Sequence, residues 1–220
     1  MKKLAYLVSA AVAVLLSSCG SSATLVQQYP KMYEEKPLAI AVMPPINQTS
    51  HAEAKDFFYT TMYTPLCEKG YYVFSPYLTM EMFQNESAYD SERFVDADIS
   101  QFKNVLGADA LVFTIIKEWK RNNLLGQLKV RVEYIIRSTK TGETLYKREG
   151  DLSLDRTSGV GGWVGMALTT LNTAVTKQVE AGRKCNAFVL SNLPAGKYHP
   201  MYGQDQNAPA GDAFIKGSVR

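Results

Sequence analysis

The residues whose chemistry is easiest to interpret stand near the N-terminus. Leu16-Ser17-Ser18-Cys19 places a branched apolar residue and two small residues directly before a cysteine. A cysteine thiolate is a nucleophile that can accept a diacylglycerol group. Small residues before it let the chain enter a peptidase in extended form. The pattern predicts that Cys19 becomes the lipid-modified first residue of the mature protein, carrying acyl chains such as palmitate.

Residues 1–18 have the organisation of a signal peptide. The chain begins with Met1-Lys2-Lys3, and an apolar run from Leu4 to Leu16 follows, interrupted only by Ser9. The run is shorter than the roughly 20 apolar residues that a transmembrane helix needs, so we expect cleavage and not a spanning helix. The alternative is an ordinary secretory signal that happens to precede a cysteine.

The residue after the cysteine predicts which membrane carries the anchor. Asp at this position is the usual signal for retention in the inner membrane, whereas this chain has Gly20. We therefore expect an anchor in the outer membrane, with the protein facing the periplasm. Two or three acyl chains hold a protein stably in a bilayer, which a single chain does not.

The length and the net charge of the chain limit the number of domains and the kinds of partner that we expect. Removing residues 1–18 from the 220 of the chain leaves 220 − 18 = 202, which suits a single domain. The formal charge of +3 falls to +1 when Lys2 and Lys3 leave with the signal. A nearly neutral chain gives no electrostatic reason to expect a nucleic-acid partner.

The order of apolar segments predicts an α/β fold: one domain with a mixed sheet and helices packed against it. Strands are expected at residues 38–43, 71–74, 110–116, 128–136 and 144–154, and helices are expected to begin at Ser50, Ser75, Asp98 and near Trp163. The first three strands alternate with helices, which favours parallel pairing through right-handed crossovers. The later strands should form an antiparallel meander.

Several boundaries follow from local signals. Residues 19–37 are expected to be an irregular lipidated tether, because Pro30 and Pro37 discourage regular structure, and residues 38–190 the globular domain. Residues 191–220 are rich in Pro, Gly and Asn and are expected to be irregular. Ser50 and Glu53 match a capping box, and Gly182 is expected to end the last helix.

The strand 128–136 has the clearest alternation in the chain. Its apolar residues are separated by Lys129, Arg131 and Glu133. Successive side chains on a strand point to opposite faces, so one face should lie in the core. The residues expected in the core are Leu128, Val130, Val132, Tyr134 and Ile136.

Two further cysteines, Cys67 and Cys185, remain after Cys19 is acylated. Export delivers them to an oxidising compartment, which favours a disulfide between them. Two unrelated buried thiols are the alternative, because the spacing that a disulfide requires is a property of the folded chain.

The glycine-rich segment 159–165 precedes the last expected helix. Backbone N–H groups of such a loop can bind phosphate, but no P-loop Lys-Ser/Thr follows here. A flexible segment that allows close helix packing is the plainer interpretation. A third is a small apolar patch for a partner or the membrane surface, formed by Val160, Trp163 and Val164.

Other catalytic or metal signatures are weak. His51 and His199 stand far apart without paired cysteines, which is a poor metal site, and we expect no cofactor. Carboxylates are numerous, so a pair of the kind that glycosidases use stays open as an alternative. Asp109 directly precedes a buried strand. An aspartate in such a position more often caps a turn than takes part in catalysis. The tyrosines around positions 59–72 fit either core packing or a protein partner.

Two segments resemble a family of bacterial lipoproteins whose domain has no established function. They are Val42-Met43-Pro44-Pro45-Ile46-Asn47-Gln48-Thr49 and Asn192-Leu193-Pro194-Ala195-Gly196-Lys197-Tyr198-His199-Pro200. Usual members have Tyr-Gly-Pro-Tyr where this chain has Ala195-Gly196-Lys197-Tyr198. The order of elements is also similar to curli-secretion-channel lipoproteins and to lipoproteins that activate peptidoglycan synthases.

The resemblance implies a non-enzymatic protein that binds or assembles envelope protein partners, a second copy of the chain among them. Two other functions stay open. One is a peptidoglycan- or glycan-processing enzyme that uses a carboxylate pair, and the other is a subunit of a secretion pore.

Overall fold

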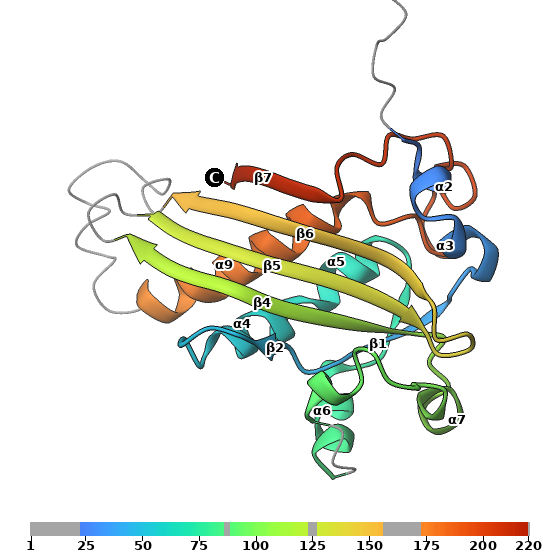
Figure 1. Cartoon of the computed structure of the whole chain (residues 1–220), viewed down its shortest axis with the longest axis horizontal. Helices are drawn as coiled ribbons and strands as arrows, with labels where there is room; N and C mark the ends of the chain where they lie inside the picture. Colours follow the sequence, from blue (N-terminus) through green and yellow to red (C-terminus); the bar gives the residue numbers. More distant parts are fainter. Residues whose placement is uncertain (1–22, 86–88, 123–126, 156–172, 220) are drawn as a thin grey trace, which may run out of the picture.

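The computed structural model describes residues 23–85, 89–122, 127–155 and 173–219 (Figure 1). The described strands are β1 (Ala39–Val42), β2 (Ile46–Asn47), β3 (Tyr72–Val73), β4 (Ala110–Asn122), β5 (Gln127–Ser138), β6 (Thr144–Asp155) and β7 (Phe214–Val219). The described α-helices are α2 (Leu25–Gln28), α3 (Pro30–Glu35), α4 (Ala54–Thr61), α5 (Tyr63–Glu68), α6 (Pro76–Asn85), α7 (Gln101–Leu106) and α9 (Thr173–Val189). Two short 3-10 helices are Ser91–Arg93 and Leu190–Asn192.

The strands form one mixed seven-stranded sheet in the order β3-β1-β4-β5-β6-β7, with β2 also paired to β4. β1 is parallel to both β3 and β4, whereas β4, β5 and β6 are antiparallel. The predicted α/β class, with a parallel start followed by a meander, is therefore confirmed. β7 was not predicted, and it adds to β6 in parallel.

Helices cover the two faces of the sheet unequally. α4, α5 and α9 pack on one face and enclose the larger core (Figure 1). On the other face, α6 and α7 cover only the region of β1 and the start of β4, around a smaller core that contains Met43, Phe102 and Phe113. No described helix covers the rest of β4, β5 and β6 on that side.

β5 confirms the predicted alternation. Val130, Val132 and Tyr134 are completely buried in the larger core, while Lys129 is exposed on the other face. Since a shift by one residue would expose the whole apolar set, this burial specifies the pairing register of the strand.

The segment predicted to be an irregular tether is ordered from Ala23 onward, which corrects that expectation. Pro30 stands in the first turn of α3, where a backbone N–H would have no partner within the helix, so its absence costs no hydrogen bond. Leu25, Tyr29 and Met32 are 4–5% exposed and pack into the larger core. The burial of these three side chains keeps the segment on the domain.

Other boundaries also differ from the sequence-based expectations. α4 begins at Ala54 with Glu53 as its N-cap and no side-chain cap hydrogen bond, so the expected start at Ser50 is wrong. α9 continues past Gly182 to Val189. A Cβ on Gly182 would lie 2.6 Å from the carbonyl oxygen of Phe57, so the glycine permits close contact between α9 and α4. The predicted start of this helix near residue 163 lies outside the described residues.

The C-terminal segment is more regular than predicted. Besides β7, residues 206–210 pair with the start of the described chain. The buried guanidinium of Arg148 joins this segment to the domain, because it donates to the carbonyl oxygens of Asp212 at 3.0 Å and Val189 at 2.9 Å. Val189 ends α9, where a positive charge is favourable.

No helix among the described residues is long and apolar enough to cross a membrane.

Candidate functional site

Cys19 and the predicted patch of Val160, Trp163 and Val164 lie outside the described residues. Their roles therefore stay predictions. The candidate sites lie between Ala23 and Val219, outside the three internal segments that the structure does not describe.

The structure corrects the predicted disulfide, because Cys67 and Cys185 are both free thiols. Cys185 is completely buried in the larger core, and burial raises the pKa of its thiol to about 12. A thiol that stays protonated in this way is unreactive. Cys67 is half-buried beside Tyr63. The structure therefore agrees with the alternative interpretation, in which Cys67 and Cys185 are unrelated thiols.

Both histidines have structural partners. The ring of His51 stacks on Trp119 with 5.4 Å between centroids, and its Nε2 lies 3.0 Å from Gln178 Oε1. The backbone oxygen of His51 accepts a bond from the Asn47 amide. His199 accepts a bond from the backbone N–H of Met201. In the described part of the chain, no three His, Cys, Asp or Glu side chains gather as a metal site would require.

The uncovered face of the sheet holds a pair of facing carboxylates. Glu133 and Glu149 stand opposite each other on β5 and β6, in the wall of a groove of about 400 Å³. Lys117 Nζ lies 3.1 Å from a Glu133 oxygen and 2.8 Å from a Glu149 oxygen. Lys147 adds a second bridge to Glu133, and Arg131 pairs with Glu149.

This carboxylate pair is poorly suited to acid catalysis. Burial raises the pKa of Glu149, but hydrogen bonds and charge from Lys117 and Arg131 lower it by more, so its net pKa lies below the ordinary value. A glycosidase needs one carboxyl group whose pKa is raised, so that it can donate a proton. Lys117 and Arg131 favour the ionised form of Glu149, and the cluster is best described as a network of ion pairs.

The C-terminal motif loop, residues 192–200, holds the chain against the end of α5. The N–H of Gly196 donates to the carbonyl oxygen of Lys69 at 2.7 Å, and the N–H of Tyr198 donates to that of Gly70 at 2.9 Å. A Cβ on Gly196 would lie only 2.5 Å from the Gly70 oxygen, so close backbone approach requires glycine. The motif therefore has a structural role.

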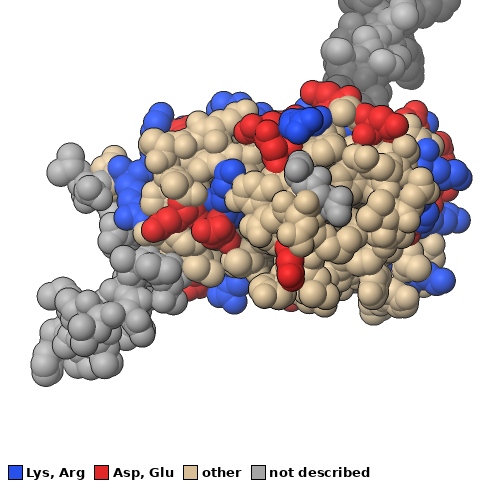
Figure 2. All heavy atoms as spheres, turned by 90° about the horizontal axis from the view of Figure 1, so that it is seen from below, with Lys and Arg blue, Asp and Glu red and all other residues tan. Residues whose placement is uncertain are grey.

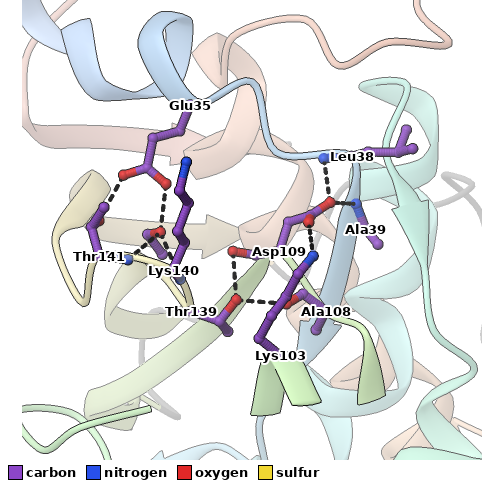
Figure 3. Close-up of polar contacts among 10 residues, drawn as sticks. Glu35, Leu38, Ala39, Lys103, Ala108, Asp109, Thr139, Lys140 and Thr141 are labelled. Atoms are coloured by element: carbon purple, nitrogen blue, oxygen red, sulfur yellow. Dashed lines mark hydrogen bonds and ion pairs between the residues drawn. The ribbon is translucent and has the colours of Figure 1, made fainter. Parts of the chain in front are cut away.

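Asp109 connects three segments that are distant in sequence (Figure 3). One carboxylate oxygen accepts the backbone N–H groups of Leu38 and Ala39, at 3.0 and 2.9 Å, and the other pairs with Lys103. The backbone oxygen of Asp109 accepts the Thr139 hydroxyl at 2.9 Å. The carboxylate thus fixes the start of β1 against the start of β4.

Glu35, the last residue of α3, makes a second connection in the same region. Its carboxylate accepts the hydroxyl groups of Ser138, the last residue of β5, and of Thr141, in the turn between β5 and β6 (Figure 3). Ser138 in turn accepts the backbone N–H groups of Lys140 and Thr141, both at 3.1 Å. Glu35 therefore holds the end of α3 against this part of the sheet.

Replacing Asp109 by asparagine is expected to lower the free energy of unfolding by about 2 kcal/mol at pH 7, because charge-assisted hydrogen bonds are lost. Burial raises the pKa of Asp109, but Lys103 and the two backbone donors lower it by more, so the folded pKa lies below the unfolded value. The stabilisation is full above the unfolded pKa of about 4 and is lost as pH falls through the folded pKa.

Urea unfolding of the mature chain between pH 7 and pH 2 measures the stabilisation that Asp109 contributes. The difference between the native chain and Asp109→Asn should stay constant down to about pH 5 and shrink below about pH 4. Lys103→Met is the matched control, since it removes the ion pair and keeps both backbone bonds, and we expect it to lose less stability. A difference that grows on acidification would contradict the assignment.

A different surface exposes large uncharged side chains along consecutive elements. Four of them lie on α5, β3 and the first turn of α6, and we call them the tyrosine surface: Tyr63, Tyr72, Tyr77 and Leu78, which are 43, 53, 78 and 58% exposed. Figure 2 views the molecule from the side of α6 and α7 and shows a wide uncharged area there, with few acidic side chains.

Rigid elements position the tyrosine surface. The hydroxyl of Tyr59 on α4 donates to the carbonyl oxygen of Pro76 at 2.7 Å, which fixes the start of α6. Tyr72 contacts Phe74 edge-on, with 5.4 Å between ring centroids. β3 lies at the edge of the sheet, paired only with β1 among the described strands. The sequence predicts an aromatic-rich region that contains Tyr59, Tyr63 and Tyr72, but only their burial in the structure distinguishes the core residue Tyr59 from the exposed Tyr72.

Comparisons with known proteins identify relatives of this chain. Residues 27–197 match the family model described as "Putative lipoprotein GNA1162-like". The Neisseria meningitidis protein described as "Putative lipoprotein NMB1124/NMB1162" is 25% identical over 109 residues, which are 50% of this chain. The match covers 51% of that relative, so it spans about half of its length.

Solved structures add information on the fold. The crystal structure of lipoprotein GNA1162 from Neisseria meningitidis superposes with a TM-score of 0.51 at 20% identity, covering 66% of this chain and 99% of that one. This likeness shows a shared fold. The PelC dodecamer from Paraburkholderia phytofirmans gives a TM-score of 0.43 at 14% identity, covering 72% of this chain and 89% of that one.

Proposed function

The chain belongs to the GNA1162-like lipoprotein family, and from this premise we propose that it is a non-enzymatic binding or assembly module of the bacterial envelope. Its lipid anchor is Cys19, in the outer membrane, and its folded domain faces the periplasm. The partner is an envelope protein, or a second copy of this chain, that binds the tyrosine surface.

The exposure of the tyrosine surface is the observation that carries this proposal. Tyrosine side chains bury a large area on binding and keep a polar hydroxyl group for hydrogen bonds, which is why they are enriched at protein interfaces. Tyr77 and Leu78 stand next to each other in the first turn of α6 and are mostly exposed to solvent. α6 carries a single charged side chain, Glu81, so the cost of removing charges from water is small.

The two alternative functions have less support. The carboxylates Glu133 and Glu149 are paired with cations, which argues against a glycan-processing enzyme that would use them. The alternation on β5, which suggested a pore subunit, is accounted for by the core on one face and the ion pairs on the other.

The experiment that tests the proposal is photo-crosslinking in intact cells. A photoreactive amino acid is placed at Tyr72 or Tyr77, and Lys129 on the uncovered sheet face is the matched exposed control. We expect one adduct of the same mass from positions 72 and 77, and none from 129. An adduct of twice the mass of the chain would identify a second copy as the partner.

A second variant separates binding from folding. Leu78→Asp in the chain that carries the crosslinker at Tyr77 should reduce the adduct at least about 10-fold, as a buried charge costs more than 1.4 kcal/mol. The thermal midpoint should not change, because Leu78 is 58% exposed. Absence of a specific adduct at all three positions would refute the binding function. An adduct from Lys129 alone would move the binding site to the uncovered sheet face.

A further inference from the structure

The first described residues are held firmly on the domain. The N–H of Leu25 donates to the carbonyl oxygen of Ala208 at 2.9 Å, and the N–H of Ala210 donates to that of Ala23 at 2.9 Å. Thr24 forms an isolated antiparallel bridge with Pro209. The side chain of Leu25 is 5% exposed. The chain therefore leaves the domain at Ala23, beside residues 206–210.

The distance between this exit and the lipid anchor is short. Only Gly20, Ser21 and Ser22 stand between Cys19 and Ala23. Four residue steps reach at most about 14 Å, even when the chain is fully extended. A folded domain of about 200 residues has a radius of gyration of about 16 Å, so the reach is shorter than the width of the domain. A domain held so closely cannot present every side to the membrane equally.

The surface formed by the paired segments 23–28 and 206–210 exposes no charged side chain. Its exposed residues, which we call the exit surface, are Ala23, Gln27, Gln206, Asn207 and Pro209. α2 itself carries no charged side chain. A neutral polar surface can lie against lipid headgroups without desolvating a charge, and without lysine or arginine it gains little from anionic lipids.

We propose that the exit surface faces the lipid headgroup layer and that the tyrosine surface points away from the membrane. This inference rests on the lipidation of Cys19 in the proposed function. α2 and the red loop that precedes β7 lie at the top of the molecule in Figure 1, and α6 lies at the bottom. A partner of the tyrosine surface therefore approaches from the aqueous side, while the domain stays within about 14 Å of its anchor.

Fluorescence quenching in vesicles tests this orientation. The lipidated protein carries a fluorophore at Asn207→Cys on the exit surface, or at Gln84→Cys on α6, both exposed positions. Cys67→Ser removes the half-buried thiol, and Cys185 is protected by complete burial. Vesicles of phosphatidylcholine, or of phosphatidylethanolamine with phosphatidylglycerol, contain a headgroup nitroxide quencher. We expect at least threefold stronger quenching at 207 than at 84, and the same ratio in both lipid mixtures.

A linker variant provides the control. Ten Gly-Ser residues inserted between Ser22 and Ala23 should bring the two quenching values together, because the longer reach frees the domain. Equal quenching at 207 and 84 in protein that floats with the vesicles would overturn the orientation and leave the proposed function intact. Protein that does not float would refute the anchor, and with it both proposals. Stronger quenching only in the anionic vesicles would refute the neutral contact.

Discussion

Replacing Cys19 by alanine is expected to abolish acylation completely and to leave an uncleaved or mislocalised precursor. The thiol is the nucleophile that takes the lipid, and no other side chain of the segment 1–22 can replace it. Metabolic labelling with an alkyne fatty acid, followed by membrane fractionation, measures the effect. The native chain should be labelled and sediment with membranes, whereas the variant should carry no label.

Cys67→Ala is the matched control for this experiment, because Cys67 is a free, half-buried thiol. It should keep the full label and the same membrane fraction. Label that persists in Cys19→Ala would refute the assignment of the anchor.

Replacing Asn186 by alanine is expected to cause the largest loss of stability, about 4 kcal/mol. Asn186 is completely buried, and its amide donates to the backbone oxygen of Phe58 at 3.0 Å and to the hydroxyl of Thr61 at 2.8 Å. Its oxygen accepts the Tyr134 hydroxyl at 2.5 Å. The alanine would leave polar groups of α4 and β5 buried without their partner, and leave a cavity between them.

Thermal and urea unfolding of the mature chain measure the loss. A change of 4 kcal/mol corresponds to a decrease of about 10 °C in the midpoint for a domain of this size. Asn104→Ala, on the exposed side of α7, is the control and should change stability by less than about 0.5 kcal/mol. A loss below about 1 kcal/mol for Asn186→Ala would show that the core readjusts or admits water.

Local signals in the sequence were sufficient for several elements. The alternation in residues 128–136 predicted which side chains of β5 enter the core, because the period of a strand is a property of its own backbone. Ser75-Pro76 predicted the start of α6, since proline suits the first turn of a helix. Gly107 predicted the end of α7, where it adopts φ +72°. The mixed sheet followed from the order of these elements.

The short apolar segments near the N-terminus required tertiary contacts to become ordered. Pro30 and Pro37 suggested an irregular segment from the sequence, and α2 is only four residues long. Isolated helices this short are not stable in water. Burial of Tyr29 and Met32 in the larger core supplies the free energy that the local sequence lacks.

The candidate sites also divide into features that the local sequence predicts and features that depend on tertiary contacts. The sequence determined by itself the lipidation motif, the aromatic-rich region and the apolar face of β5, because each depends on neighbouring residues. Only the tertiary structure decided that Cys67 and Cys185 are free, that Gly182 lets α9 approach Phe57 closely, and that Lys117 pairs with both Glu133 and Glu149. These outcomes depend on distances between residues far apart in the chain, and such distances exist only once the helices and the sheet have packed together.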